Sequence, residues 1–185
     1  MMRILLALSL GVACCSLWVG AEVPLQPDFQ NEKVLGKWYG IGLASNSNWF
    51  KDRKSHMKMC TTIITPTTDG NMDVTATYPK MDRCETKSMT YFKTEQPGRF
   101  RAKSPRYGSE HDMRVVETNY DEYILMYTVK TKGSETNQIV SLFGKFSFPF
   151  WLFGPKKKLK QRVMGKGGIA IQSNCYTILC SEIKY

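Results

Sequence analysis

The chain has 185 residues, 42% of them hydrophobic, and a formal net charge of +10. This length is enough for one domain with a hydrophobic core. The basic balance favours anionic partners such as fatty acids, heparin-like chains or membrane surfaces, whereas nucleic acid is not expected as a partner because no recognisable nucleic-acid-binding module is present.

The first 21 residues have the character of a secretory signal peptide. An early positive residue, Arg3, precedes an apolar run that ends in small residues at positions 20 and 21. The run is short for a membrane span, and no transmembrane segment is expected elsewhere. The protein is therefore predicted to be secreted and extracellular. Removal of the leader takes two of the six cysteines with it, and the remaining four allow three pairings.

After the leader the chain is expected to form short β-strands separated by turns. The first strand is predicted over residues 36–45, followed by a polar loop that carries the apolar pair Trp49 and Phe50. This pair either tucks onto the domain or covers the mouth of a pocket. Alternating residues and regularly spaced turns predict seven further strands over residues 56–66, 72–79, 84–93, 99–104, 109–119, 121–130 and 137–145.

Eight strands without helical periodicity predict an all-β fold. An eight-stranded antiparallel up-and-down barrel leaves no unpaired edge and has room inside for side chains or one small ligand. A sandwich of seven to nine strands fits the strand count equally well. It gives the Gly-x-Trp sequence at residues 36–38 no special role, so the barrel is preferred.

Three short features carry a family resemblance. The tripeptide at 36–38 resembles the G-x-W motif of the lipocalins, and the tripeptide at 118–120 resembles their T-D-Y motif, with Asn119 in place of Asp. Lys145 is similar to the basic residue, usually Arg, that follows the last barrel strand. The resemblance implies a lipocalin barrel whose floor is closed by Trp38, with Lys145 stacked across the indole ring. Lysine stacks less well than arginine in such a cation–π contact.

Longer segments between residues 24 and 145, with a cysteine in the second strand, resemble the prostaglandin D synthases within that family. In a strand, side chains two residues apart share a face, so Lys58, Cys60 and Thr62 lie together. Both faces carry apolar residues, and the alternation alone does not identify the inner one. The resemblance implies that Cys60 points into the cavity.

The resemblance also implies a chemistry for Cys60. Its thiolate would isomerise prostaglandin H2 to prostaglandin D2 without a cofactor, with a thiol such as glutathione assisting turnover. Lys58 would lower the thiol pKa or bind the substrate carboxylate, and Thr62 would supply a hydroxyl. Because Gly40 and Ala76 stand where the family has serine, reduced activity is expected. A buried inert thiol and a disulfide partner are the other interpretations of Cys60.

The ligand is expected to be one small lipophilic molecule, and the protein is expected to be a monomer. The candidate ligand classes are prostaglandins, retinoids, fatty acids, bile pigments and thyroid hormones. A non-catalytic extracellular carrier is the alternative to the isomerase. Ordinary core packing is the alternative for each predicted cavity residue, and these residues are Trp38, Trp49, Met72, Val74, Tyr78, Phe92, Met113, Tyr123, Leu125 and Phe143.

The predicted domains are the signal peptide at 1–21, the barrel at 22–145 and a divergent C-terminal tail at 146–185. The usual C-terminal helix of the family is not visible in the tail, which Pro149 and Pro155 interrupt. An alternative splice junction, a divergent disordered extension and a membrane-surface element are the three explanations. The resemblance implies a disulfide from Cys84 to the tail, with Cys175 or Cys180 as its partner.

Overall fold

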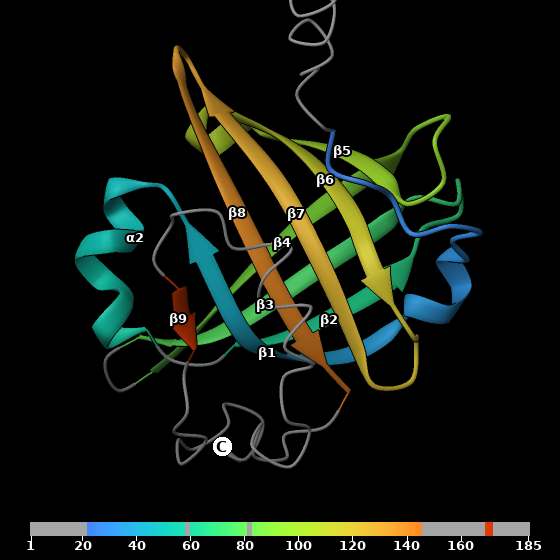
Figure 1. Ribbon diagram of the computed structural model, residues 1–185, viewed down its shortest axis with the longest axis horizontal. Coiled ribbons are helices and arrows are strands. Elements are labelled where there is room, and N and C mark those ends of the chain that lie inside the picture. Colours follow the sequence, from blue (N-terminus) through green and yellow to red (C-terminus); the bar gives the residue numbers. More distant parts are fainter. Residues whose placement is uncertain (1–21, 58–59, 81–82, 146–168, 172–185) are drawn as a thin grey trace, which may run out of the picture.

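The computed structural model describes residues 22–57, 60–80, 83–145 and 169–171, which form a closed antiparallel β-barrel (Figure 1). Each barrel strand pairs with the next one along the chain, and β1 also pairs with both β8 and β2, which closes the ring. The prediction of an eight-stranded barrel is therefore confirmed. Its strands are β1 (Gly36–Ser45), β2 (Thr61–Pro66), β3 (Met72–Lys80), β4 (Arg83–Lys93), β5 (Arg99–Ser104), β6 (Ser109–Thr118), β7 (Tyr123–Lys132) and β8 (Glu135–Gly144).

Most predicted strand limits agree with the structure, and β2 is the main exception. This strand begins at Thr61, not at residue 56, so Cys60 lies directly before it. The backbone N–H of Gly40 on β1 still donates to the carbonyl of Cys60 at 2.9 Å. Cys60 is therefore fixed against β1 although it lies outside the regular strand.

The predicted polar loop after β1 contains a short helix, which the sequence analysis missed. Helix α2 (Asn48–Arg53) is followed by the 3-10 turn η2 (Lys54–His56). The Ser47 hydroxyl caps α2 by accepting from the Phe50 backbone N–H, and the Phe50 side chain is fully buried. A helix of six residues is too short to produce a recognisable period in the sequence.

A ninth strand, β9 (Ile169–Ile171), comes from the predicted tail. It pairs antiparallel with Gly42–Ala44 in the second half of β1, beyond the part that pairs with β2. The tail therefore contributes a strand to the sheet, which the sequence analysis did not predict. Residues 146–168 and 172–185, together with the predicted signal peptide, lie outside the described residues.

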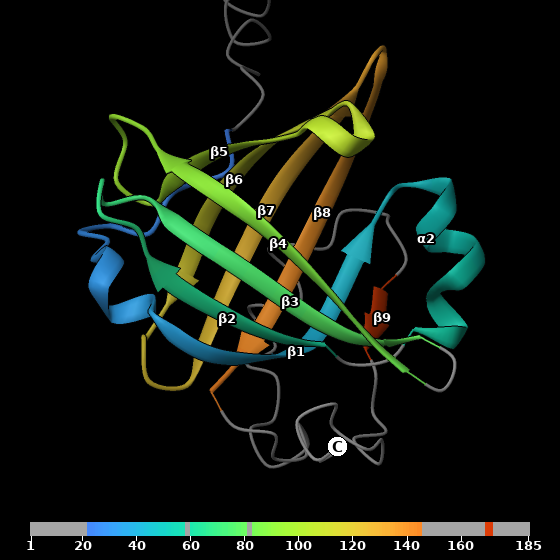
Figure 2. The ribbon, with the colours of Figure 1, turned by 180° about the vertical axis from the view of Figure 1, so that it is seen from behind.

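One end of the barrel is closed by the segment before β1, which holds the 3-10 turn η1 (Asn31–Val34) (Figure 2). Trp38 is completely buried there, and its indole N–H donates to the Val34 carbonyl at 2.7 Å. The Lys145 ammonium lies 4.0 Å from the centre of the Trp38 ring and donates to the Leu35 carbonyl. This confirms the contact that the family resemblance implied, and it ties the start of β1 to the end of β8.

The β6–β7 turn at the same end accommodates asparagine in place of the family's aspartate. The Asn119 side-chain oxygen accepts from the backbone N–H groups of Glu122 and Tyr123, at 2.9 and 3.1 Å. An amide oxygen accepts these bonds as a carboxylate does. The Tyr120 ring packs on Phe29 in the segment before β1, so the turn also holds the closed end.

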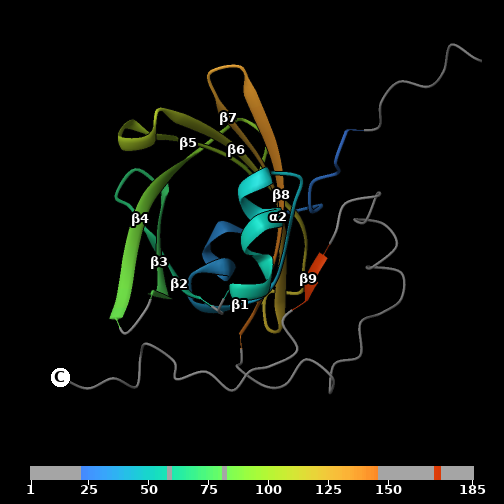
Figure 3. The ribbon, with the colours of Figure 1, turned by 90° about the vertical axis from the view of Figure 1, so that its left-hand side faces the viewer.

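The opposite end of the barrel is open, and α2 lies in front of the opening (Figure 3). Since consecutive strands are antiparallel, the β1–β2, β3–β4, β5–β6 and β7–β8 connections all lie at this end. The β5–β6 connection holds the 3-10 turn η3 (Pro105–Tyr107). Within the described residues, no helix is both long enough and apolar enough to cross a bilayer.

Candidate functional site

The inner face of the barrel is identified by the buried core. Trp38, Ile64, Met72, Met113 and Met126 belong to one packed cluster, and every second residue of their strands shares their face. Cys60 and Thr62 have the same alternation as Ile64 and therefore face inward. The structure thus settles the choice that the sequence pattern left open.

The interior is filled at the closed end and accessible at the open end. Inward-facing Trp38, Thr62 and Met72 are buried. Inward-facing Ala76, Thr128 and other residues nearer the opening are only half-buried, although barrel strands surround them on all sides. Half-burial of inward-facing residues means that solvent reaches them through the opening. A ligand entering there would displace this water and contact the inner wall.

The Cys60 thiol lies on this wall, against β1. It is half-buried and is the free cysteine among the described residues. A Cβ atom placed on Gly40 would lie 2.9 Å from its sulfur, so the sulfur occupies the space that a side chain at position 40 would need. The Thr62 hydroxyl lies 4.0 Å from the sulfur and is the described side-chain polar partner closest to it. Thr62 is therefore placed as predicted, while Lys58 lies outside the described residues.

The surroundings of Cys60 disfavour its charged form. Burial raises the pKa of the thiol above its ordinary value, and hydrogen bonding from Thr62 and from the backbone of residues 60 and 40 offsets this only in part. Among the described residues, no cation contributes to this pKa. Without a further charge from outside those residues, Cys60 is a neutral thiol at neutral pH.

The predicted cavity residues divide into three groups. Trp38, Met72 and Met113 belong to the core cluster at the closed end. Val74 and Phe143 pack against this cluster. Tyr78 faces inward near the opening, on the same face of β3 as Met72 and Val74. Four predictions are corrected. Strand register places three of these side chains on the outer face, where Leu125 is nevertheless buried, and the fourth, the exposed Trp49, lies on α2; the outer three are Phe92, Tyr123 and Leu125.

The strand alternation explains these corrections. Ile124 and Met126 of β7 point into the core, so Tyr123 and Leu125, which alternate with them, point outward. The Tyr123 hydroxyl donates to Glu117 on the outside of the barrel. On β4, Tyr91 packs against the core while the adjacent Phe92 is 53% exposed. Apolar character alone was therefore a poor guide to the inner face.

A polar network inside the barrel, centred on His111, was not predicted by the sequence analysis. The ring nitrogens of His111 lie 3.4 Å from the Tyr91 hydroxyl and 3.4 Å from the Ser109 hydroxyl. A neutral imidazole accepts at one nitrogen and donates at the other, so it can serve both groups. His111 shares one face of β6 with Met113 and Val115, because the three residues are spaced two apart. This alternation in the sequence could have predicted that His111 points into the barrel.

Burial and the opposing Lys130 lower the pKa of His111. The unfolded chain therefore binds a proton at a higher pH than the folded protein does. As the pH falls below the unfolded value of about 6.5, the free energy of unfolding decreases, until the folded pKa is passed. In the His111→Gln variant, the free energy of unfolding is expected to decrease less as the pH falls. Chemical denaturation at several pH values would measure this difference. The exposed His56→Gln variant serves as the control, and an equal effect of both substitutions would contradict the prediction.

A second polar group lies at the mouth of the barrel. The Lys87 ammonium lies 5.3 Å from the centre of the Tyr78 ring and 5.4 Å from that of Tyr107. The Tyr78 hydroxyl donates to Glu85 at 3.1 Å. Contact with the Tyr78 hydroxyl is the main cause that raises the pKa of Lys87. A cation between two aromatic rings is thus held at the opening, on the path of an entering ligand.

The predicted disulfide remains a prediction. Cys84 is on β4 and is not a free thiol, whereas Cys175 and Cys180 lie outside the described residues.

Residues 35–146 match the model of the lipocalin / cytosolic fatty-acid binding protein family. Together with the closed eight-stranded barrel and its tryptophan floor, this match shows that the chain belongs to the lipocalin family, whose barrels bind ligands. The solved structure of the siderocalin Ex-FABP, described as functioning through dual ligand specificities, superposes with a TM-score of 0.61 and 24% sequence identity. That match covers 77% of this chain and 95% of the other, and it supports the fold.

Several curated proteins are similar to the chain. A protein named lipocalin from Rhinella marina is 72% identical over 134 residues, which is 72% of this chain and 73% of the relative. Prostaglandin-H2 D-isomerase from Canis lupus familiaris is 42% identical, with 65% of this chain and 71% of that protein covered. The Mus musculus enzyme of the same name is 46% identical, with 59% and 58% covered. The chain thus spans little more than half of the mouse enzyme.

Proposed function

We propose that this lipocalin binds one small lipophilic molecule in its barrel and that Cys60 converts prostaglandin H2 to prostaglandin D2. The observation that carries the proposal is a free thiol on the accessible inner wall of the barrel. Relatives named prostaglandin-H2 D-isomerase support it. The expected ligands are prostaglandins and other lipophilic molecules such as retinoids or fatty acids, and secretion of the protein as a monomer is part of the same proposal.

The proposed reaction is a balanced isomerisation. The thiolate attacks one peroxide oxygen, an S–O bond forms, and the O–O bond breaks to leave an alkoxide that takes up a proton as the hydroxyl. A base then removes the hydrogen on the carbon that carries the S–O oxygen. The electron pair forms the ketone, the S–O bond breaks, and the thiolate is released. No net oxidation occurs, so no redox cofactor is needed; glutathione is an optional assistant.

A non-catalytic carrier is the second candidate, and two features of the Cys60 environment favour it. Burial raises the pKa of the thiol, and Gly40 and Ala76 offer no side-chain hydroxyl at the inward-facing positions next to it on β1 and β3. Ala76 is the pairing partner of Thr62 on β3. In this alternative the interior binds the same class of lipophilic ligand, and Cys60 takes no part in chemistry.

The Cys60→Ala variant separates the two functions. We expect product formation from prostaglandin H2 to fall to the uncatalysed level, because the nucleophile is gone. Quenching of tryptophan fluorescence by retinoic acid measures ligand binding. The affinity of the variant for retinoic acid is expected to stay within about twofold of the wild-type value, since a thiol contributes little apolar contact area. Equal product from both proteins would overturn the isomerase and leave the carrier. Loss of binding together with turnover would instead show that the variant is damaged beyond the reaction step.

A further inference from the structure

The two ends of the barrel carry opposite charge. In the described connections of the open end, residues 46–57, 105–108 and 133–134, four exposed basic residues accompany one acidic residue, Asp52. Within the described part of the chain, none of the four forms an ion pair with a carboxylate, so their charge is not compensated locally. These basic residues are Lys51, Arg53, Lys54 and Arg106.

The closed end has the reverse composition. Its described connections, residues 27–35, 67–71, 94–98 and 119–122, hold six exposed acidic residues and one basic residue, Lys33. Among the described residues, the charged side chains of the connections are therefore divided unevenly between the two ends of the barrel. The described charges by themselves favour an orientation with the open end toward a negatively charged surface and the closed end away from it.

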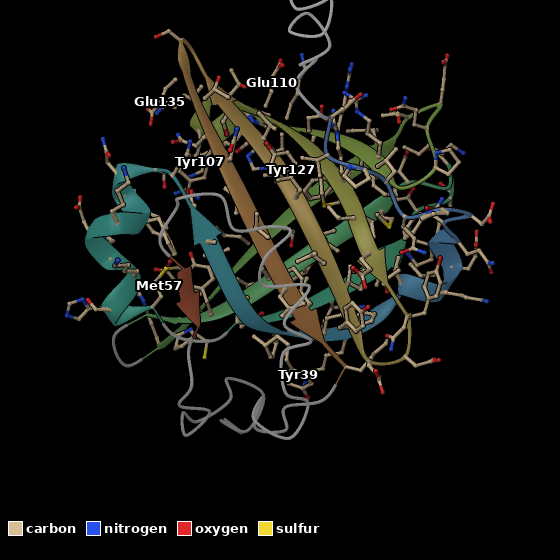
Figure 4. All side chains as sticks on the ribbon, viewed as in Figure 1. Tyr39, Met57, Tyr107, Glu110, Tyr127 and Glu135 are labelled. Carbon is tan, nitrogen blue, oxygen red and sulfur yellow. The ribbon has the colours of Figure 1, made fainter. Side chains whose placement is uncertain are left out.

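Exposed aromatic side chains lie among the basic residues of the open end. Trp49 on α2 is 59% exposed, and Tyr107 on η3 is 43% exposed. In Figure 4 Tyr107 lies at the same end of the barrel as Glu110 and Glu135, which flank the β5–β6 and β7–β8 turns. The other large exposed hydrophobic side chains of the described residues, Ile63 and Phe92, lie singly on the outer faces of strands.

Helix α2 presents both kinds of side chain. Phe50 anchors the helix to the barrel, and the residues around it, Trp49, Lys51, Arg53 and Lys54, are all exposed. The basic residues among them are 2–5 positions from the tryptophan in sequence, so one surface contact can include the indole ring and the charges. We call the group formed by Trp49, Lys51, Arg53, Lys54, Arg106 and Tyr107 the open-end surface.

We propose that the open-end surface binds an anionic lipid membrane, with the mouth of the barrel directed at the bilayer. The basic residues would contact lipid phosphate and carboxylate groups, and the Trp49 and Tyr107 rings would enter the interface, where such side chains are favoured. A sulfated glycan would also attract the charges, but it offers no apolar phase for exposed aromatic rings. A lipophilic ligand could then pass between bilayer and barrel without crossing water.

Vesicle sedimentation tests this proposal without using any turnover. We expect the protein to bind vesicles of phosphatidylcholine with about 30% phosphatidylserine, and to bind pure phosphatidylcholine much more weakly. Each basic residue near an anionic surface contributes about 1 kcal/mol, or about fivefold in partitioning. The triple variant Lys51→Gln/Arg53→Gln/Lys54→Gln is therefore expected to bind about a hundredfold more weakly.

A control variant changes the net charge by the same amount away from the opening. Lys37, Lys93 and Arg101 are exposed on β1, β4 and β5, and their triple replacement by glutamine is expected to reduce binding less than about fivefold. All these variants keep residues 146–185 unchanged, so any contribution of that segment is common to them. Equal losses in both triple variants, or no loss in the open-end variant, would overturn the proposal.

Trp49 provides a second readout. Its fluorescence is expected to shift to shorter wavelength on the phosphatidylserine vesicles, and Trp49→Phe should remove that part of the shift while leaving the protein folded, because the side chain is mostly exposed. The protein could instead be retained on heparin through the open-end residues and show no vesicle binding. That result would identify a glycan-binding surface and overturn the proposal of membrane binding. Because prostaglandin conversion is not measured, failure here leaves the proposed isomerase or carrier function standing.

Discussion

Trp38→Ala is expected to lower the free energy of unfolding by about 3–5 kcal/mol, the range found for large buried aromatic residues. The indole is completely buried, donates to the Val34 carbonyl and is covered by the Lys145 ammonium. Its removal leaves a cavity at the barrel floor, a carbonyl without its donor and a cation without its ring. Chemical denaturation followed by circular dichroism measures the loss without relying on tryptophan fluorescence.

Two variants show whether the effect belongs to the floor. Trp49→Ala removes the same kind of side chain from an exposed site and is expected to cost less than about 0.5 kcal/mol. Lys145→Met keeps the indole and removes the cation, for an expected loss of about 0.5–2 kcal/mol. If Trp38→Ala lowered the free energy of unfolding by less than about 1 kcal/mol, compared with the expected loss of about 3–5 kcal/mol, the tryptophan floor would not be a main source of the stability of the barrel.

Alkylation of Cys60 by iodoacetamide is expected to accelerate about a hundredfold between pH 6.5 and 8.5. Only the thiolate reacts, and its fraction rises about tenfold per pH unit below the thiol pKa. Because burial raises the pKa of Cys60 above its ordinary value of 9.0, no plateau is expected below that pH. Mass spectrometry of the peptide containing Cys60 distinguishes this thiol from the others, and isomerase turnover should rise with pH over the same range.

Substitution of Gly40 tests what controls this thiol. Both Gly40→Ala and Gly40→Ser add a Cβ that displaces the sulfur, but only serine offers a hydroxyl that can donate to a thiolate. We expect alkylation to be faster at pH 7 for the serine variant than for the alanine variant. A wild-type plateau near pH 7 would contradict the neutral thiol and indicate an activating charge outside the described residues.

The local sequence predicted the regular strands well, because alternation and turns are local features. The first and fifth strands have the predicted limits, and Gly70 in the turn between β2 and β3 has a positive φ, as glycine in a tight turn often does. Helix α2 was missed because its six residues depend on the Ser47 cap and on burial of Phe50. Strand β9 was missed because its pairing with β1 is a contact between residues more than a hundred positions apart.

The site was predicted less completely than the fold. Alternation showed that Cys60 and Thr62 share a face, and the family resemblance chose the inner one, which the core packing confirms. Apolar character misplaced Phe92, Tyr123 and Leu125, since aromatic and aliphatic residues also cover the outside of this barrel. The contact of His111 with Tyr91 joins strands β6 and β4, so the local sequence does not contain it, whereas Ser109 is only two residues from His111 on the same strand.

The sequence by itself determined the strands, the tryptophan floor and the position of a lone thiol next to a hydroxyl residue. Each of these depends on residues a few positions apart or on a short family motif. Only the tertiary structure decided that the Cys60 sulfur fills the space left by Gly40 and that burial raises the pKa of this thiol. Packing across strands sets the desolvation of a group, and desolvation sets its pKa. The barrel closure likewise separated a basic, aromatic open end from an acidic closed end.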